Sequence, residues 1–484
     1  MKSQNASVLN IRDIALRDNF TASEKFNFLT LFVIFIALTW SPDNRSIWTF
    51  GFVLIIASSS IINIKIHEIV HPFIIDKLWI KLLCFNLPAI FLLITYFLTA
   101  LGNCIEPITI ANSTFLELKR PENLFSTNVA FKENWILFLS LISLFTLCTH
   151  LLLIPKSLYF INKFINWCCV TIFFIVFLGF IFKAADLAKP IFSTGTGQID
   201  FFFYFPYDGG WAAFALLWMY VSYATSIIEY EKTNREFTET NTPFYLALCS
   251  ILASTTLIIQ ASISSLFLSL AFVHICILCY HYFNKRKEPK LKLIKPYLFL
   301  LGAGSVLKGI HTFTQLNANN LVTENLKKSG LEMFLDNPIF GWGLNSFRKL
   351  SPYYNDAHLL NHNYETIPSS AINLLVEFGI IGLLVICLYA LTLYLLYIIK
   401  KQTNPFSSTL FFALFLIILL SFLDNPFYSL PVTFSFWIIG FLAIRWAQLI
   451  YHRADEVDTQ TKLLTTDELR NVPFVTNPKK EVFK

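Results

Sequence analysis

Charged residues are scarce in this chain. Lys, Arg, Asp and Glu make up 14% of its 484 residues, whereas a soluble domain carries about 25%. The chain also lacks the alternating segments of about ten residues that a transmembrane β-barrel requires. These two shortages exclude an ordinary soluble enzyme and an outer-membrane barrel.

The nine cysteines do not form the spacing pattern of a disulfide framework. Eight of them fall inside apolar runs, where a free cysteine behaves as a small hydrophobic residue. The adjacent Cys168 and Cys169 and the C-x-x-C pair Cys276 and Cys279 lie in such runs. We therefore expect no disulfide framework, no metal site and no cofactor.

Long hydrophobic runs account for most of the chain, which is 55% hydrophobic and contains 51 Phe. A helix of about 20 apolar residues crosses the roughly 30 Å hydrocarbon layer of a bilayer. The runs predict an all-α fold, a polytopic integral membrane protein with about 12 transmembrane helices. The predicted spans are 26–40, 46–63, 79–101, 134–154, 165–183, 210–228, 243–260, 263–281, 295–311, 371–399, 406–423 and 429–449.

Lys and Arg are concentrated in alternate connections between these spans. With a cytoplasmic N-terminus, the inside segments and adjoining span ends hold 26 of the 37 Lys and Arg, as the positive-inside rule requires. Both termini are then cytoplasmic. This predicts a cytoplasmic segment 1–25, a membrane domain 26–449 and a cytoplasmic tail 450–484. A large outward loop, 312–370, precedes the tenth helix, and 102–133 also faces outward.

The 312–370 loop contains two structural signals. Leu326, Gly330, Leu331 and Phe334 fall on one face of an amphipathic pattern, which predicts a helix lying on the membrane surface. "NPIFGWG" (337–343) then ends that helix, because proline restricts the residue before it and glycine permits left-handed backbone. We expect this turn to fold the loop back over a membrane-embedded site.

Two motifs in this region carry a family resemblance. "FLDNPIFGWGLNSFR" (334–348), followed by "NLLVEFGIIGLL" (373–384), resembles the O-antigen ligase and O-antigen polymerase (Wzy/WaaL-like) superfamily. The resemblance is strong over 325–390, and "FPYDGGWAAFALLW" (205–218) is similar more loosely. It implies a multi-pass glycosyltransferase of the bacterial inner membrane that needs no metal. The implied partners are an undecaprenyl-pyrophosphate-linked oligosaccharide, an acceptor glycan and the lipid bilayer, with a polysaccharide chain-length regulator as a further candidate.

The loop has the residue types that this reaction needs. Pyrophosphate is bound well by cations, and the acceptor hydroxyl needs a base. The expected catalytic residues are His362, His358 and Glu377. The expected substrate-binding residues are Arg348, Lys308, Trp342, Tyr353, Tyr354 and Asp208.

Each of these residues also has a purely structural interpretation. The two histidines fit a solvated loop, and Arg348 and Lys308 fit side chains that reach up to lipid headgroups. Asp208 fits a turn, Trp342 fits an architectural role between its two glycines, and Glu377 fits a helix start.

Two departures from the family pattern bear on the acceptor. Pro368 and Ser369 stand where members commonly have His-Asn, and 258–268 has no Arg where many have Ser-Arg-Gly. These departures favour a polymerase of surface polysaccharide over a ligase that transfers glycan to lipid A core or protein. A flippase or transporter for the lipid-linked glycan is an alternative of another class, although no internal repeat typical of transporters is evident. A non-catalytic membrane scaffold is a further alternative, because the family's Arg and His are missing.

Overall fold

A computed structural model describes twelve segments of the chain: 22–39, 105–110, 113–118, 158–184, 208–232, 241–257, 263–284, 294–316, 320–343, 346–354, 366–399 and 405–463. The predicted spans 46–63, 79–101 and 134–154 lie outside the described residues. So do His358 and His362.

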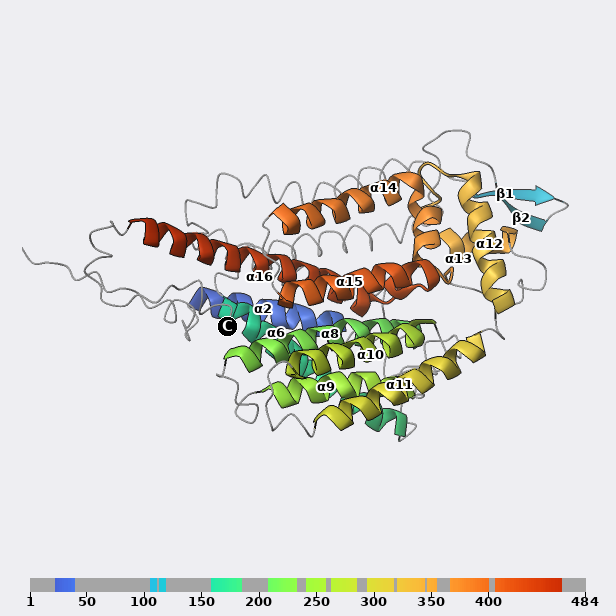
Figure 1. The fold of residues 1–484 in the computed structure, drawn as a ribbon. Helices are drawn as coiled ribbons and strands as arrows, with labels where there is room; N and C mark the ends of the chain where they lie inside the picture. Colours follow the sequence, from blue (N-terminus) through green and yellow to red (C-terminus); the bar gives the residue numbers. More distant parts are fainter. Residues whose placement is uncertain are drawn as a thin grey trace, which may run out of the picture.

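The described elements are mostly helices (Figure 1). The first half of the chain contributes α2 (Ala22–Thr39), β1 (Ile105–Ile110), β2 (Ser113–Leu118), α6 (Leu158–Ala184) and α8 (Asp208–Lys232). The middle contributes α9 (Thr242–Ser254), η2 (Thr255–Leu257), α10 (Ile263–Asn284) and α11 (Ile294–Leu316). The remainder contributes α12 (Asn320–Asp336), α13 (Ser346–Tyr354), α14 (Ser370–Ile399), α15 (Pro405–Leu423), η5 (Pro426–Tyr428) and α16 (Leu430–Leu463).

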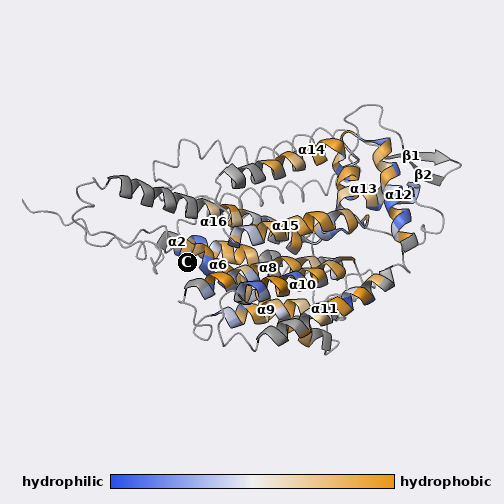
Figure 2. Ribbon diagram, in the orientation of Figure 1, coloured by the Kyte–Doolittle hydropathy of each residue, from blue (hydrophilic) through white to orange (hydrophobic). Residues whose placement is uncertain are grey.

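Several helices have the length and composition of membrane spans. Among the described residues, four are long and apolar enough to cross a bilayer: Leu158–Ile181, Gly209–Tyr230, Ile263–Tyr282 and Pro405–Leu423. Figure 2 shows that hydrophobic residues dominate the bundle, whereas α12 carries several hydrophilic ones. The prediction of a helical membrane protein is confirmed. The number of about 12 spans stays a prediction.

Helix α8 lies at the centre of the bundle and packs against α9, α10, α15 and α16. Every residue from 209 to 227 is buried. Its Ala, Gly and Ser residues let neighbouring backbones approach closely, as in other membrane helices. The Trp218 indole N–H donates to the Ser435 hydroxyl at 3.0 Å, and the Tyr220 hydroxyl lies 2.9 Å from His274 Nδ1. These bonds fasten α8 to α16 and α10.

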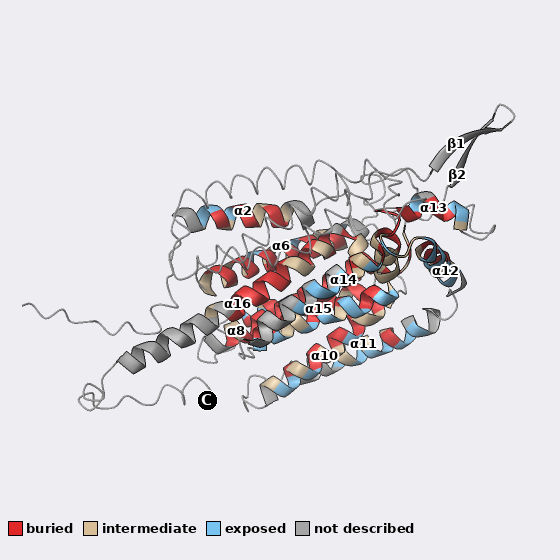
Figure 3. Ribbon diagram, turned by 90° about the horizontal axis from the view of Figure 1, so that it is seen from above, coloured by how far each residue is buried: buried red, intermediate tan, exposed pale blue. Residues whose placement is uncertain are grey.

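The outer faces of the bundle are apolar and exposed. Figure 3 shows pale blue, exposed residues along α11 and α15, with buried residues on the inner helices. Leu300, Leu307 and Phe313 on α11 and Phe415 on α15 are among the exposed side chains. Lipid tails solvate such side chains, so these faces fit the hydrocarbon layer.

Helix α14 differs from the single span predicted at 371–399. Gly379 has non-helical torsion angles (φ 64°, ψ −163°), so the helix is broken into two segments. Figure 1 shows the chain turning sharply there, with the first segment beside α12 and the second running along the bundle. The hydropathy of 371–399 is continuous across this break, which is why a single span was expected.

Three further differences are smaller. Helix α9 ends at Ser254 and passes into η2, whereas a span to residue 260 was expected. Helix α16 continues to Leu463, so part of the predicted 450–484 tail is helical. In the 102–133 segment, β1 and β2 pair as a short antiparallel hairpin that was not expected in this helical fold. Figure 1 shows this hairpin at the same end of the bundle as α12 and α13.

Candidate active site

The turn 337–343 is hydrogen-bonded to the break in α14. The backbone N–H of Trp342 donates to the Val376 carbonyl at 2.7 Å, and that of Gly343 donates to the Glu377 carbonyl at 2.9 Å. These two carbonyls would otherwise accept helical bonds from residues 380 and 381. The turn therefore replaces donors that the break removes.

The broken helix also donates hydrogen bonds to the turn. The N–H of Ile380 donates to the Pro338 carbonyl at 2.8 Å, and that of Ile381 donates to the Ile339 carbonyl at 3.3 Å. Unpaired backbone groups are costly in an apolar setting. Because the turn and the break satisfy each other's groups, the two family-like motifs form one structural unit.

Two glycines make this close approach possible. Gly341 and Gly379 have φ angles of 70° and 64°, which L side chains rarely adopt. A Cβ atom on Gly341 would lie 2.6 Å from the Val376 carbonyl oxygen. A Cβ on Gly379 would overlap the carbonyl of Ile339 and lie 2.8 Å from the Gly341 nitrogen. Neither position has room for a side chain.

A small core lies beneath the turn. Trp342 is completely buried (0% exposed), and its indole N–H donates to the Met333 carbonyl at 2.6 Å. The Asn337 amide donates to the Gly341 carbonyl at 2.6 Å, which closes the turn. The buried members of this core are Leu326, Met333, Trp342, Phe347, Leu350, Ile367 and Val376.

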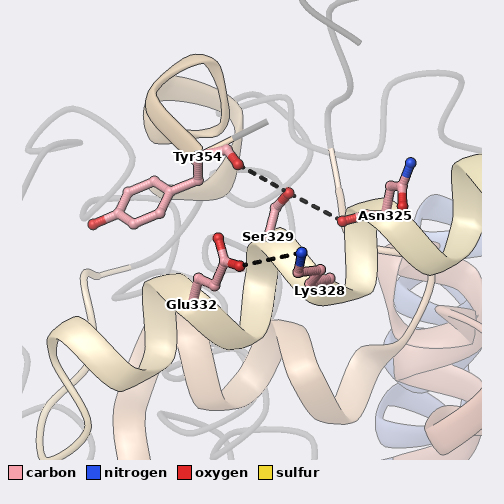
Figure 4. A network of polar contacts seen from close by, with 5 residues as sticks. All are labelled: Asn325, Lys328, Ser329, Glu332 and Tyr354. Carbon is pink, nitrogen blue, oxygen red and sulfur yellow. Dashed lines mark hydrogen bonds and ion pairs between the residues drawn. The ribbon is translucent and has the colours of Figure 1, made fainter. Parts of the chain in front are cut away.

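Polar contacts join α12 to α13 (Figure 4). The Ser329 hydroxyl lies 3.0 Å from the carbonyl oxygen of Asn325 and 3.3 Å from that of Tyr354. The Tyr354 hydroxyl donates to Asp336 Oδ2 at 2.7 Å. On the outer face of α12, Lys328 and Glu332 form an exposed ion pair at 3.9 Å. The two short helices are thus held together at one end of the bundle.

The expected aromatic residues fall in three different environments. Trp342 presents no exposed ring face, which favours its architectural interpretation over contact with a sugar. Tyr354 is partly buried, and its hydroxyl is engaged by Asp336. Tyr353 is exposed on α13.

The expected ionisable residues are also spread out. Arg348 is exposed on α13, and Lys308 is partly exposed on α11. Asp208 is the first residue of α8. Glu377 is only 6% exposed, and its Oε1 accepts a 3.0 Å hydrogen bond from the Asn373 amide. Of these four, Arg348 and Glu377 lie in the part formed by α13 and the α14 break.

A second polar cluster, not expected from the sequence, lies where α15 ends. The Asn425 amide donates to the Ile367 carbonyl at 3.2 Å, and the Ser370 hydroxyl donates to Asn425 Oδ1 at 2.5 Å. The N–H of Ser370 donates to the Asp424 carbonyl at 3.0 Å. The Asp424 side chain accepts a hydrogen bond from the Ser264 hydroxyl of α10. This cluster fastens α10 and the start of α14 to the end of α15.

The sequence contained a signal for this cluster. "FLDNP" occurs twice, at 334–338 and at 422–426. Both copies end a helix, α12 and α15 respectively, and in both the Asn amide donates to a backbone carbonyl. The two copies hold the first segment of α14 at its two ends, Gly379 and Ile367–Ser370.

Comparisons with family models and with curated proteins add no relative. No protein-family model matches the chain, and no curated protein matches it. The family resemblance therefore rests on the two motifs alone. Within the part of the chain that the structure describes, no three His, Cys, Asp or Glu residues are grouped so that they could hold a metal ion.

Proposed function

We propose that this protein is a bacterial inner-membrane glycosyltransferase that polymerises a surface polysaccharide, an O-antigen or exopolysaccharide, from undecaprenyl-pyrophosphate-linked repeat units at the periplasmic face. The observation that supports it best is the hydrogen-bonded contact between the 337–343 turn and the α14 break. Both motifs of the family resemblance take part in this contact. It gives the polar segment between α12 and α14 a rigid base at one end of an apolar bundle.

The substrate has requirements that this arrangement meets. A polyprenyl tail needs an apolar surface within the bilayer, and the helices expose one. The pyrophosphate needs a cation at the membrane boundary, for which exposed Arg348 is the best candidate because guanidinium binds phosphate oxygens in pairs. Exposed Tyr353 suits a sugar ring. His358 and His362 belong to the same connection between α13 and α14, and they stay candidates for assisting the acceptor hydroxyl.

Two alternatives make different predictions. A ligase would use the same donor and pass the finished glycan to lipid A core or to protein. A flippase would move the lipid-linked unit across the bilayer, and transporters use broken helices near the middle of the membrane. Helix α14 is broken, but its break lies beside α12 and is filled by the turn. This position favours a transferase.

The test is complementation in a deletion strain of the native host, with surface polysaccharide separated on a gel. Wild type, Arg348→Ala, His358→Ala and His362→Ala are compared at equal membrane levels. Single repeats in the deletion strain, with a ladder restored by wild type, support the polymerase. Long polymer that stays on the carrier indicates a ligase, and lipid-linked units trapped on the cytoplasmic face indicate a flippase. Restoration by all three variants would rule out these site residues.

A further inference from the structure

Asp424 lies where a membrane span ends. It follows directly after Pro405–Leu423, one of the helices long and apolar enough to cross the bilayer. An ionisable residue at such a place is a candidate functional residue by default. The pyrophosphate head of a lipid carrier lies in the same boundary layer. A group that acts on the sugar beside that head must therefore lie near this depth.

The Asp424 carboxylate has capacity left for a ligand. One oxygen accepts a hydrogen bond from Ser264, and the other accepts one from the Asn425 N–H at 2.8 Å. A carboxylate offers about four acceptor positions. The side chain is partly exposed, whereas Ser264 is fully buried. In the described part of the chain, no ion pair engages Asp424.

The second copy of FLDNP differs from the first in what surrounds its Asp. In both copies, the Asn and Pro make the turn. Asp336 is exposed on the outer side and accepts the Tyr354 hydroxyl. Asp424 instead faces α10, between the bundle and the start of α14. The turn itself is therefore closed by Asn425, whereas the Asp424 carboxylate is turned toward Ser264 of α10 and keeps acceptor positions beyond that contact.

Other carboxylates near the site are less suited to proton transfer with a sugar. Glu377 is almost fully buried and held by Asn373. Lys327 on α12 places its ammonium 3.2 Å from the Leu423 carbonyl, one residue from Asp424.

We propose that Asp424 is the general base of the transfer reaction, an inference that rests on the proposed function. Its carboxylate takes the proton from the acceptor sugar hydroxyl while that oxygen attacks the anomeric carbon of the carrier-linked sugar. The bond from the anomeric carbon to the pyrophosphate oxygen breaks, and undecaprenyl pyrophosphate leaves with the electron pair. Ser264 holds the carboxylate in place through its hydroxyl.

The experiment compares Asp424→Asn with Asp336→Asn in the deletion strain. An amide at 424 still accepts the Asn425 N–H and can donate to the Ser264 oxygen, so the turn is preserved while the base is lost. Asp336→Asn makes the same chemical change in the same five-residue sequence. Polymer is measured per amount of protein in the membrane. We expect Asp424→Asn to lower polymer by about 100-fold or more, and Asp336→Asn to stay close to wild type.

Each other outcome has a distinct meaning. If Asp424→Asn restores the ladder, Asp424 is not the base, and the proposed function stands. If both variants lose activity equally, the loss comes from damage to the turn that both FLDNP sequences form. The role of Asp424 as a base is then also overturned. If wild type itself restores no polysaccharide, the proposed function fails, and the base role fails with it.

Discussion

The backbone N–H of Trp342 donates a 2.7 Å hydrogen bond to the carbonyl of Val376, although the whole of α13 lies between the two residues in the sequence. This bond is one of four that join the 337–343 turn to the broken helix α14. The side chain of Trp342 is buried beneath the turn and bonded to Met333. Both the backbone and the side chain of Trp342 thus hold the turn in place. Substitutions in this turn should therefore lower the stability of the protein.

Gly379→Ala should destabilise the protein strongly. A Cβ atom at this position overlaps the Ile339 carbonyl, and the φ of 64° disfavours any L side chain. Strained backbone of this kind costs about 1–3 kcal/mol, and the lost cross-bonds add to it. The measurement is thermal unfolding in detergent. Gly304→Ala is the matched control, because no heavy atom lies within 4 Å of the added Cβ; equal melting temperatures for the two variants would contradict the prediction.

Trp342→Phe should lower stability by about 1–3 kcal/mol. The Met333 carbonyl loses the indole donor at 2.6 Å and keeps the longer bond from the Asn337 N–H at 3.4 Å. Trp342→Ala should cost about 3–5 kcal/mol, since a large buried side chain is also removed. Unfolding of the purified variants in detergent gives both values. A sugar-stacking role would instead leave stability unchanged in Trp342→Phe and lower activity alone.

Asn425 and Ser370 should be energetically coupled. Their side chains share a 2.5 Å hydrogen bond, and Asn425 also donates to Ile367. A double-mutant cycle of Asn425→Ala and Ser370→Ala should show a coupling of about 1 kcal/mol. Additive losses of unfolding free energy would show that this hydrogen bond contributes nothing.

Arg348→Ala should reduce polymer formation by about 100-fold or more, because it removes the cation that we propose binds the departing pyrophosphate. Stability should change by less than about 0.5 kcal/mol, as expected for an exposed side chain. Arg348→Lys should restore only part of the activity, since an ammonium lacks the paired geometry of guanidinium. The control is Glu332→Ala on the exposed face of α12. It should leave both polymer formation and stability unchanged, because an exposed ion pair contributes little.

The sequence was sufficient for the parts of the fold that depend on local pattern. Apolar runs predicted α2, α6, α8, α10 and α15 close to their observed positions. The residues of "NPIFGWG" predicted a turn at the end of α12 because Pro and Gly act locally. The amphipathic pattern likewise predicted α12 itself.

Contacts between residues that are distant in the sequence could not be predicted from such local patterns. Hydropathy did not reveal the break at Gly379, because one apolar stretch runs across it from residue 370 to residue 384. The break depends on donors supplied by the distant turn. Trp342 has the residue type of a sugar-binding ring, and its burial depends on Met333 and Tyr354. The repeated FLDNP could have been recognised from the sequence, but its contacts with Ser264 and Ser370 could not.

The filled break in α14 has a consequence for how this protein can change. The 337–343 turn and the first half of α14 complete each other's backbone, so neither fits a foreign partner. A chimera that exchanges the polar loop with that of a related protein must carry residues 334–382 as one cassette. Sequence change over evolution faces the same constraint, since the two ends of the cassette must change together.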